Sequence, residues 1–254
     1  MIDTYLTVAL SFVIGFSIFL SMPIVLRKNP SIKRMLLYNA FAIGILVFLL
    51  MDIYGNVAAI FGTSNITSPF EIVFIAGFAA SFLFFILPKG SRDPSRAPKR
   101  TSLLAAIGIG FQNLTEGLVF GSAGAAGLLP LYVLSFIGFS LQDVTEGVPI
   151  AMPLVGTKQK IEKRFITGVF LLGGLPVVLG TLIGLVFFSN MFIVFFDSLA
   201  SAAILYVILV LFHVNINRSW SGSRRAKDHS IWLTYAGVLL GFAAAFVVNY
   251  VVVA

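Results

Sequence analysis

Eight long apolar stretches dominate the sequence, and they constrain the fold more than any other feature. The hydrocarbon core of a bilayer is about 30 Å thick, which an α-helix of roughly 20 apolar residues can cross. The stretches have about that length, and they occupy residues 4–26, 36–60, 69–88, 101–122, 128–156, 165–188, 191–213 and 230–253. We therefore expect an all-α integral membrane protein with eight transmembrane helices, in which residues 1–254 form a single transmembrane domain.

The composition excludes several other classes of protein. Charged residues make up 11% of the 254 residues, whereas a soluble domain has about 25%. The net charge of +7 does not indicate nucleic-acid binding, because the basic residues lie only in short segments between the apolar stretches. The chain has no cysteine, which excludes disulfides and thiolate ligands for a metal.

The basic residues predict the orientation of the helices. All 17 Lys and Arg residues fall in the connections that follow the first, third, fifth and seventh stretches. Connections rich in Lys and Arg stay in the cytoplasm, so both termini are expected outside. The longest of them, Pro88 to Arg100, is expected to be a flexible connector. The first stretch follows no basic residue and is interpreted as a retained helix, not a signal peptide. The expected location is the plasma membrane of a prokaryote.

Three acidic residues, Glu116, Asp143 and Glu146, lie deep inside apolar stretches. A charge at the bilayer centre costs about 2.5–3.5 kcal/mol, so such residues usually mark an ion path, a relay or a tight pair. The three belong to two related hexapeptides, 30 residues apart, which form an internal repeat on neighbouring antiparallel helices. The hexapeptides are Gln112-Asn113-Leu114-Thr115-Glu116-Gly117 and Gln142-Asp143-Val144-Thr145-Glu146-Gly147.

The spacing predicts that the two hexapeptides face each other near the middle of the membrane. In each of them the Gln and the Glu are four residues apart and share a helix face. Facing carboxylates repel each other, and neither stretch contains a Lys, Arg or His that could neutralise them. A divalent cation would remove the conflict, and oxygen ligands at this spacing suit such an ion. Alternatively, the polar side chains only bond one another and join two helices.

Glycines and prolines add expectations about packing. Gly117 with Gly121, and Gly180 with Gly184, form two GxxxG pairs, which favour close approach of helices. Pro149 and Pro153 are expected to bend the fifth helix and to free backbone carbonyls.

The two hexapeptides resemble motifs of the ZIP (Zrt/Irt-like) family of divalent metal transporters, H-N-x-P-E-G in helix four and H/Q-E/D-x-P-E-G in helix five. That family also has eight helices with both termini outside. The resemblance implies a metal site between helices four and five, at which Gln112, Glu116, Gln142 and Glu146 are ligands. It implies a second metal position with Asn113, Asp143 and a bridging Glu146. It also implies transport toward the cytoplasm, with helices one, four, five and six moving against the others.

Several residues depart from the pattern of that family. Gln112 replaces its metal-binding His, and Leu175 precedes Pro176 where the family often has a Glu. Residues 210–212 (Val-Leu-Phe) replace a carboxylate-rich segment of helix seven. An amide oxygen binds Zn²⁺ more weakly than an imidazole does, so the set of ligands leans toward Mn²⁺ or Fe²⁺.

The leading interpretation is a carrier, not an enzyme, whose substrate is Zn²⁺, Mn²⁺ or Fe²⁺ and which needs no organic cofactor. Its expected partners are divalent metal ions and the lipid bilayer, with a homodimer left open and no nucleic acid. Asp52, in the outer half of the second stretch, is expected to help at the outer entrance. The alternatives are a non-transporting homologue, with a structural ion or a protein partner, and an intramembrane metal-dependent hydrolase. Neither His213 nor His229 lies at the depth that such a hydrolase requires.

Overall fold

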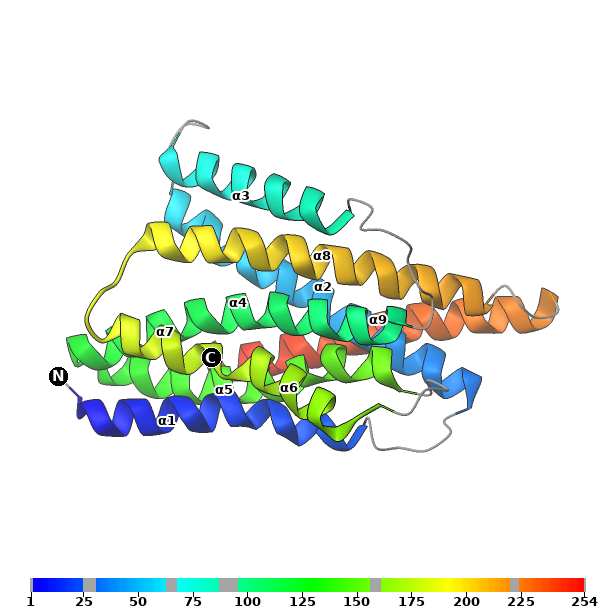
Figure 1. Cartoon of the computed structure of the whole chain (residues 1–254), viewed down its shortest axis with the longest axis horizontal. Helices are drawn as coiled ribbons and strands as arrows, with labels where there is room; N and C mark the ends of the chain where they lie inside the picture. The colour runs from blue at the N-terminus through cyan, green and yellow to red at the C-terminus, as the bar shows by residue number, and fades with distance from the viewer. Residues whose placement is uncertain are drawn as a thin grey trace.

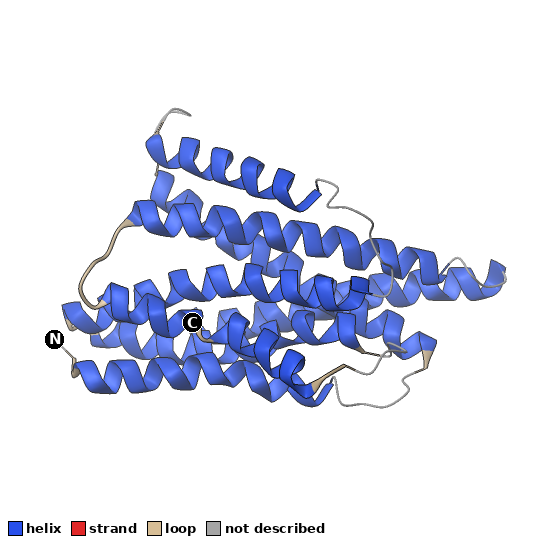
Figure 2. Ribbon diagram, viewed as in Figure 1, coloured by secondary structure: helices blue, strands red, loops and turns tan. Residues whose placement is uncertain are grey.

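The computed structural model describes residues 2–24, 31–62, 68–86, 96–155, 161–219 and 224–253, and in these ranges it contains helices and no strand (Figure 2). Two of the helices are short 3₁₀ segments, η1 and η3, which continue α1 and α5. The bounds are α1 (Thr4–Ser17), η1 (Ile18–Ile24), α2 (Ile32–Phe61), α3 (Pro69–Ile86), α4 (Ala97–Ala126), α5 (Leu129–Ala151), η3 (Met152–Leu154), α6 (Lys163–Gly174), α7 (Pro176–Gly184), α8 (Asn190–Ser219) and α9 (Arg224–Val253).

Seven described segments are long and apolar enough to cross a membrane, with α1–η1 and α6–α7 each counted as one. The protein is therefore an all-helical integral membrane protein. The eighth expected span is α5, which has 23 residues and is thus about 35 Å long. It is not among the seven, because the polar residues of its hexapeptide lower its mean hydropathy.

Several helices extend further than the apolar stretches predict. α4 begins at Ala97 rather than at 101, and α9 begins at Arg224 rather than at 230. The expectation that the basic residues lie in loops is thus wrong for those inside helices. They include Lys99 and Arg100 in the first turn of α4, and Lys33, Lys163 and Arg224 at the starts of α2, α6 and α9. Lys and Arg are good helix formers, and their long side chains carry the charge away from the apolar segment. Residues 88–95 of the expected connector lie outside the described ranges.

Two stretches that were expected to be single helices are interrupted. The fifth ends as an α-helix at Ala151 and continues as η3, and the Ile150 carbonyl accepts a hydrogen bond (2.8 Å) from Ser102 of α4. The change to η3 occurs next to Pro153, whereas α5 continues through Pro149 without a break. The sixth is broken between α6 and α7, because Pro176 has no N–H with which to continue the hydrogen-bond ladder. It ends at Gly184 rather than at 188.

The helices form two groups that meet through α4 and α8 (Figure 1). In the first, which we call the site group, α4 packs against α5, α6 and α7, and α1 packs against α5 and α7. In the second, the support group, α2 packs against α8 and α9, and α3 packs against α8. The main contacts between the groups join α4 to α8 and α5 to α9.

Successive spans run in opposite directions, so the helix ends that carry basic residues gather at one end of the bundle, on the right in Figure 1. We call this the basic end. It contains the first turns of α2, α4 and α6, with Lys33, Lys99 and Lys163 among their residues. The uneven distribution of charge along the sequence is therefore also a property of the folded molecule.

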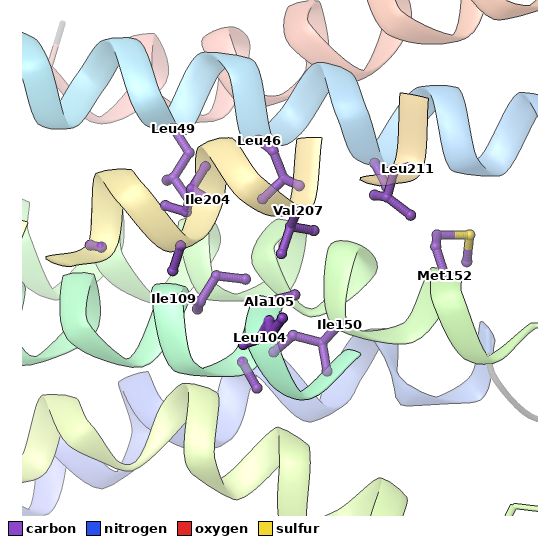
Figure 3. Packing of buried hydrophobic residues seen from close by; sticks show 14 of the residues in the cluster. Leu46, Leu49, Leu104, Ala105, Ile109, Ile150, Met152, Ile204, Val207 and Leu211 are labelled. Atoms are coloured by element: carbon purple, nitrogen blue, oxygen red, sulfur yellow. The ribbon is translucent and has the colours of Figure 1, made fainter. Parts of the chain in front are cut away.

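A buried apolar cluster lies between α4 and the helices around it (Figure 3). Ile109 of α4 and Ile150 of α5 meet Ile204 and Leu211 of α8 in this cluster. On α4, its members Leu104, Ala105 and Ile109 all lie between the basic end and Gln112. Apolar side chains therefore separate the hexapeptide of α4 from the basic end in this conformation.

The two GxxxG pairs pack directly against each other, which confirms the expected close approach. Gly117 of α4 lies against the backbone of Val177 and Thr181 in α7, and Gly180 of α7 lies against the backbone of Leu114 in α4. No side chain separates the two helices at this crossing. The hexapeptide of α4 is therefore held on its far side by the backbone of α7.

Candidate cation site

The fold brings the two hexapeptides together between α4 and α5. Their six polar candidates are all buried, and none is more than 8% exposed. α4 and α5 run antiparallel (Figure 1), so the Gln and Glu of one helix can meet those of the other. The structure thus joins all six residues that the sequence singles out: Gln112, Asn113, Glu116, Gln142, Asp143 and Glu146.

The Gln and Glu side chains form one hydrogen-bonded cluster. Gln142 donates from Nε2 to Oε1 of Glu116 (2.7 Å) on the other helix and to Oε1 of Glu146 (3.0 Å) on its own helix. Gln112 donates from Nε2 to the same Oε1 of Glu116 (3.1 Å). The amide of Gln142 therefore bridges the two glutamates.

Asn113 and Asp143 form a second polar contact beside this cluster. Asn113 donates from Nδ2 to Oδ1 of Asp143 (2.6 Å) and to the backbone carbonyl of Gly173 (3.0 Å). Gly173 lies in the last turn of α6, next to the break before Pro176. A carbonyl near a helix end is available to a side chain, so the interruption of this span ties α6 to the site.

Five of the six residues each keep one buried oxygen without a hydrogen-bond partner. Leaving a buried acceptor unsatisfied costs about 1–3 kcal/mol, and more for a charged group. Native proteins contain few such atoms, so these five oxygens are free to accept a proton shared between two carboxyl groups, to accept a hydrogen bond from a water molecule or to bind a cation. The atoms are Oε1 of Gln112, Oδ1 of Asn113, Oε2 of Glu116, Oδ2 of Asp143 and Oε2 of Glu146.

The cluster contains three carboxyl groups close together and no Lys, Arg or His among its six residues. Asp143 and Glu146 lie within hydrogen-bonding reach of each other, and Glu116 shares the amide of Gln142 with Glu146. Along α4 the nearest cationic residue is Arg100, twelve positions before Gln112, or about 18 Å. A bound cation would both balance the charge and bind the unpartnered oxygens.

The described residues contain no group of three or more His, Cys, Asp or Glu side chains arranged to hold a metal ion. The reason is visible in the cluster, where the amide of Gln142 lies between two carboxylates and Asn113 contacts the third. Any cation bound here would take amide oxygens as well as carboxylates. Such ligands consist of oxygen alone, which suits hard divalent ions.

Asp52 of α2 lies in a separate polar contact in the support group. It accepts hydrogen bonds from Asn249 of α9 (3.0 Å) and from Asn56 one turn along α2 (3.4 Å). Its carboxylate is also close enough to act electrostatically on Glu116 and Glu146. Asp52 therefore belongs to the electrostatic surroundings of the cluster without bonding to it.

Asp197 of α8 is a buried acid outside the two hexapeptides, and the structure connects it to the site. It is 3% exposed, and its Oδ1 accepts a hydrogen bond (2.9 Å) from the hydroxyl of Thr115, inside the hexapeptide of α4. Thr115 and Asp197 are 82 residues apart. No local pattern marks this pair, although a buried acid in an apolar stretch is itself a signal.

The structure also locates the residues that depart from the ZIP pattern. Leu175 occupies the interruption between α6 and α7, close to Gly173, whose carbonyl is bound by Asn113. Leu211 is buried in the apolar cluster of Figure 3, so this part of α8 offers carbon where a metal path would need oxygen. The polar candidates are confined to the level of the two hexapeptides and the adjoining part of α8.

No protein-family model and no curated protein matches this chain.

Proposed function

We propose that this protein is a secondary carrier for divalent metal cations, and that the cluster between α4 and α5 binds the ion. The observation that carries the proposal is the set of five buried oxygens without partners, three of them on carboxyl groups. A divalent cation supplies the positive charge and accepts several oxygen ligands at once. No organic cofactor is needed for such transport.

The oxygen ligands of the cluster favour some divalent metal ions over others as substrates. Zn²⁺ prefers imidazole and thiolate ligands, whereas carboxylate and amide oxygens suit Mn²⁺ and other hard ions. The cluster offers only oxygen atoms among its unpartnered groups. We therefore rank Mn²⁺ and Fe²⁺ above Zn²⁺ as substrates.

The proposed direction of transport is toward the cytoplasm. The positive-inside rule assigns the basic end to the cytoplasmic side, with both termini outside, in the plasma membrane of a prokaryote. Asp52 then lies on the route of entry, where its charge attracts cations toward Glu116 and Glu146. The apolar cluster on the cytoplasmic side of Gln112 would have to open before an ion could leave.

We further propose that the chain is a divergent member of the ZIP family. The motif positions and the spans support this membership, and the helix contacts divide the chain into α1 with α4–α7 and α2, α3, α8 with α9. This is the division along which the family would move. The direct contact of Asn113 with Asp143 (2.6 Å) and the apolar Leu175 favour one bound ion over two.

Uptake into proteoliposomes tests the proposal. The purified chain is reconstituted, and uptake of Mn²⁺, Fe²⁺, Co²⁺, Zn²⁺ and Cd²⁺ is compared with that of protein-free vesicles. Saturable uptake, fastest for Mn²⁺ or Fe²⁺, is the expected result. If a folded, inserted protein takes up none of these ions, the carrier proposal is wrong.

A non-transporting homologue is the second candidate, and one observation favours it. The amide and carboxyl groups of α4 and α5 already bond one another directly, which is how a purely structural polar contact would look. In that case the cluster joins α4 to α5, with or without a structural ion, and no cation crosses the membrane. A folded, inserted protein without uptake is therefore the result that selects this candidate.

The Gln112→His variant is expected to shift selectivity toward Zn²⁺. Oε1 of Gln112 is one of the unpartnered oxygens, and an imidazole nitrogen in its place is a better ligand for Zn²⁺ than for Mn²⁺. We expect the ratio of the Zn²⁺ to the Mn²⁺ dissociation constant to fall about tenfold, or about 1.4 kcal/mol. Isothermal titration of the purified protein with each ion measures the ratio. An unchanged ratio would show that Gln112 does not contact the ion.

A further inference from the structure

Asp197 is a buried carboxylate outside both hexapeptides, and it contacts the site group from the support group. It lies on α8 and accepts the hydrogen bond from Thr115 of α4 (2.9 Å). Thr115 stands immediately before Glu116, whose carboxylate belongs to the cation cluster. A constraint on Thr115 is therefore also a constraint on the face of α4 that carries the cluster.

The hexapeptide of α5 offers an internal comparison for the contact between Thr115 and Asp197. Thr145 occupies the position in the hexapeptide of α5 that Thr115 occupies in that of α4. Both hydroxyls lie 2.7 Å from the carbonyl of the Gln three residues earlier, and Thr115 shares its one proton between this carbonyl and Asp197. Of the two, Thr115 is the one that also contacts a carboxylate on another helix. The two threonines thus have the same local role, and they differ in the contact with α8.

Several further contacts between α4 and α8 in the described residues are apolar. Gly108 lies against Ala203 and Ile204, and the rings of Phe111 and Phe196 are 5.9 Å apart. Apolar contact is non-directional and tolerates sliding between helices, whereas a hydrogen bond weakens steeply when its geometry changes. The bond from Thr115 to Asp197 is therefore a directional contact between α4 and α8 beside these apolar ones.

We propose that Asp197 is a positioning residue that, through Thr115, holds α4 in this register on α8, and that the bond must open when the site group moves. The inference uses the proposed function only where it concerns transport. In the conformation described here, buried apolar side chains of α4 lie between Gln112 and the basic end, and we call this arrangement the closed register. Removing the bond would destabilise this closed register relative to any other arrangement of the two groups.

Cross-linking in the absence of metal tests the register directly. The chain has no cysteine of its own, so Phe111→Cys with Phe196→Cys supplies a single reactive pair at the interface of α4 and α8. A short bis-maleimide is added to the folded protein, and the rate of cross-linking is measured. The rate is expected to fall when Thr115→Val or Asp197→Ala is added, because loss of the hydrogen bond lowers the equilibrium constant for the closed register by about tenfold.

Two further variants make the test specific. Thr145→Val removes the matching hydroxyl on α5 and should leave the cross-linking rate unchanged. Asp197→Asn keeps an oxygen that accepts the bond from Thr115 and should restore most of the rate lost in Asp197→Ala. Equal rates in the Thr115→Val and Thr145→Val proteins would overturn the proposal.

Uptake kinetics supply a second and separable measurement in the chain without added cysteines. Since the closed register becomes less populated, Thr115→Val should raise the KM for Mn²⁺ by about twofold or more and leave the maximal rate unchanged. A purely structural role of Thr115 would lower the amount of active protein, and therefore the maximal rate, at constant KM. If the unmodified chain takes up no ion, the carrier proposal fails, and cross-linking alone decides the role of Asp197.

Discussion

Replacing both glutamates of the cluster by glutamine, in Glu116→Gln/Glu146→Gln, is expected to weaken Mn²⁺ binding by about 100-fold or more. Each substitution removes one negative charge and keeps an oxygen that can still accept the hydrogen bond from Gln142. The protein should therefore fold, while the charge that attracts a dication is lost. Isothermal titration in detergent measures the dissociation constant, and uptake by proteoliposomes should vanish in parallel.

The matched control is Glu162→Gln. Glu162 is an exposed carboxylate just before α6 at the basic end, and it contributes nothing to the cluster. This variant should bind and transport as the unmodified protein does. If the double variant of Glu116 and Glu146 binds Mn²⁺ as tightly as the Glu162 variant does, the cluster is not the binding site of the ion.

The single variant Glu146→Gln separates transport from a structural role. A folded protein with normal thermal stability and no uptake supports transport through the cluster. A protein that no longer folds supports a role of Glu146 in joining α4 to α5. Circular dichroism against temperature distinguishes the two outcomes, because it reports helix content independently of the ion.

The second large effect is expected for Gly180→Leu at the crossing of α4 and α7. A Cβ atom at Gly180 would meet the backbone carbonyl of Leu114, and a backbone atom cannot rotate away as a side chain can. Overpacking of a buried site costs about 1–3 kcal/mol and sometimes more. We expect the variant to be strongly destabilised, with a lowered midpoint of thermal unfolding and a large aggregated fraction in size-exclusion chromatography.

Gly168→Ala on α6 is the control for this prediction. A Cβ atom at Gly168 meets nothing within 4 Å, and Ala is a better helix former than Gly. Its thermal midpoint should be unchanged or slightly raised. If Gly180→Leu unfolds at the temperature of Gly168→Ala, the close packing of α4 on α7 is not required for the fold.

Much of the fold follows from short segments of the sequence. The apolar stretches predict the helices, because a segment in a bilayer must satisfy its own backbone hydrogen bonds. The sequence also predicts that the two hexapeptides lie in contact. The i,i+4 spacing puts the Gln and Glu of each hexapeptide on one helix face, and neighbouring antiparallel helices can present those faces to each other. The six candidates indeed come together with their side chains in contact.

The ends of the helices and their interruptions were less predictable. α4 starts four residues before its apolar stretch, since hydropathy marks the bilayer core and the helix itself continues beyond it. Pro176 signals a break, but the use of the Gly173 carbonyl by Asn113 depends on how α6 packs against α4. Hydropathy carries no information about such a contact.

The sequence by itself determined the all-helical fold and its long apolar segments, the separation of charge between the two ends, and the six polar residues of the candidate site. These properties depend on composition and on periods of a few residues, which are local. Only the tertiary structure decided that Asp197 contacts Thr115, that five oxygens are left without partners, and that apolar side chains lie between Gln112 and the basic end. These depend on the rotation and register of packed helices, which are set by side-chain contacts between residues far apart in the chain.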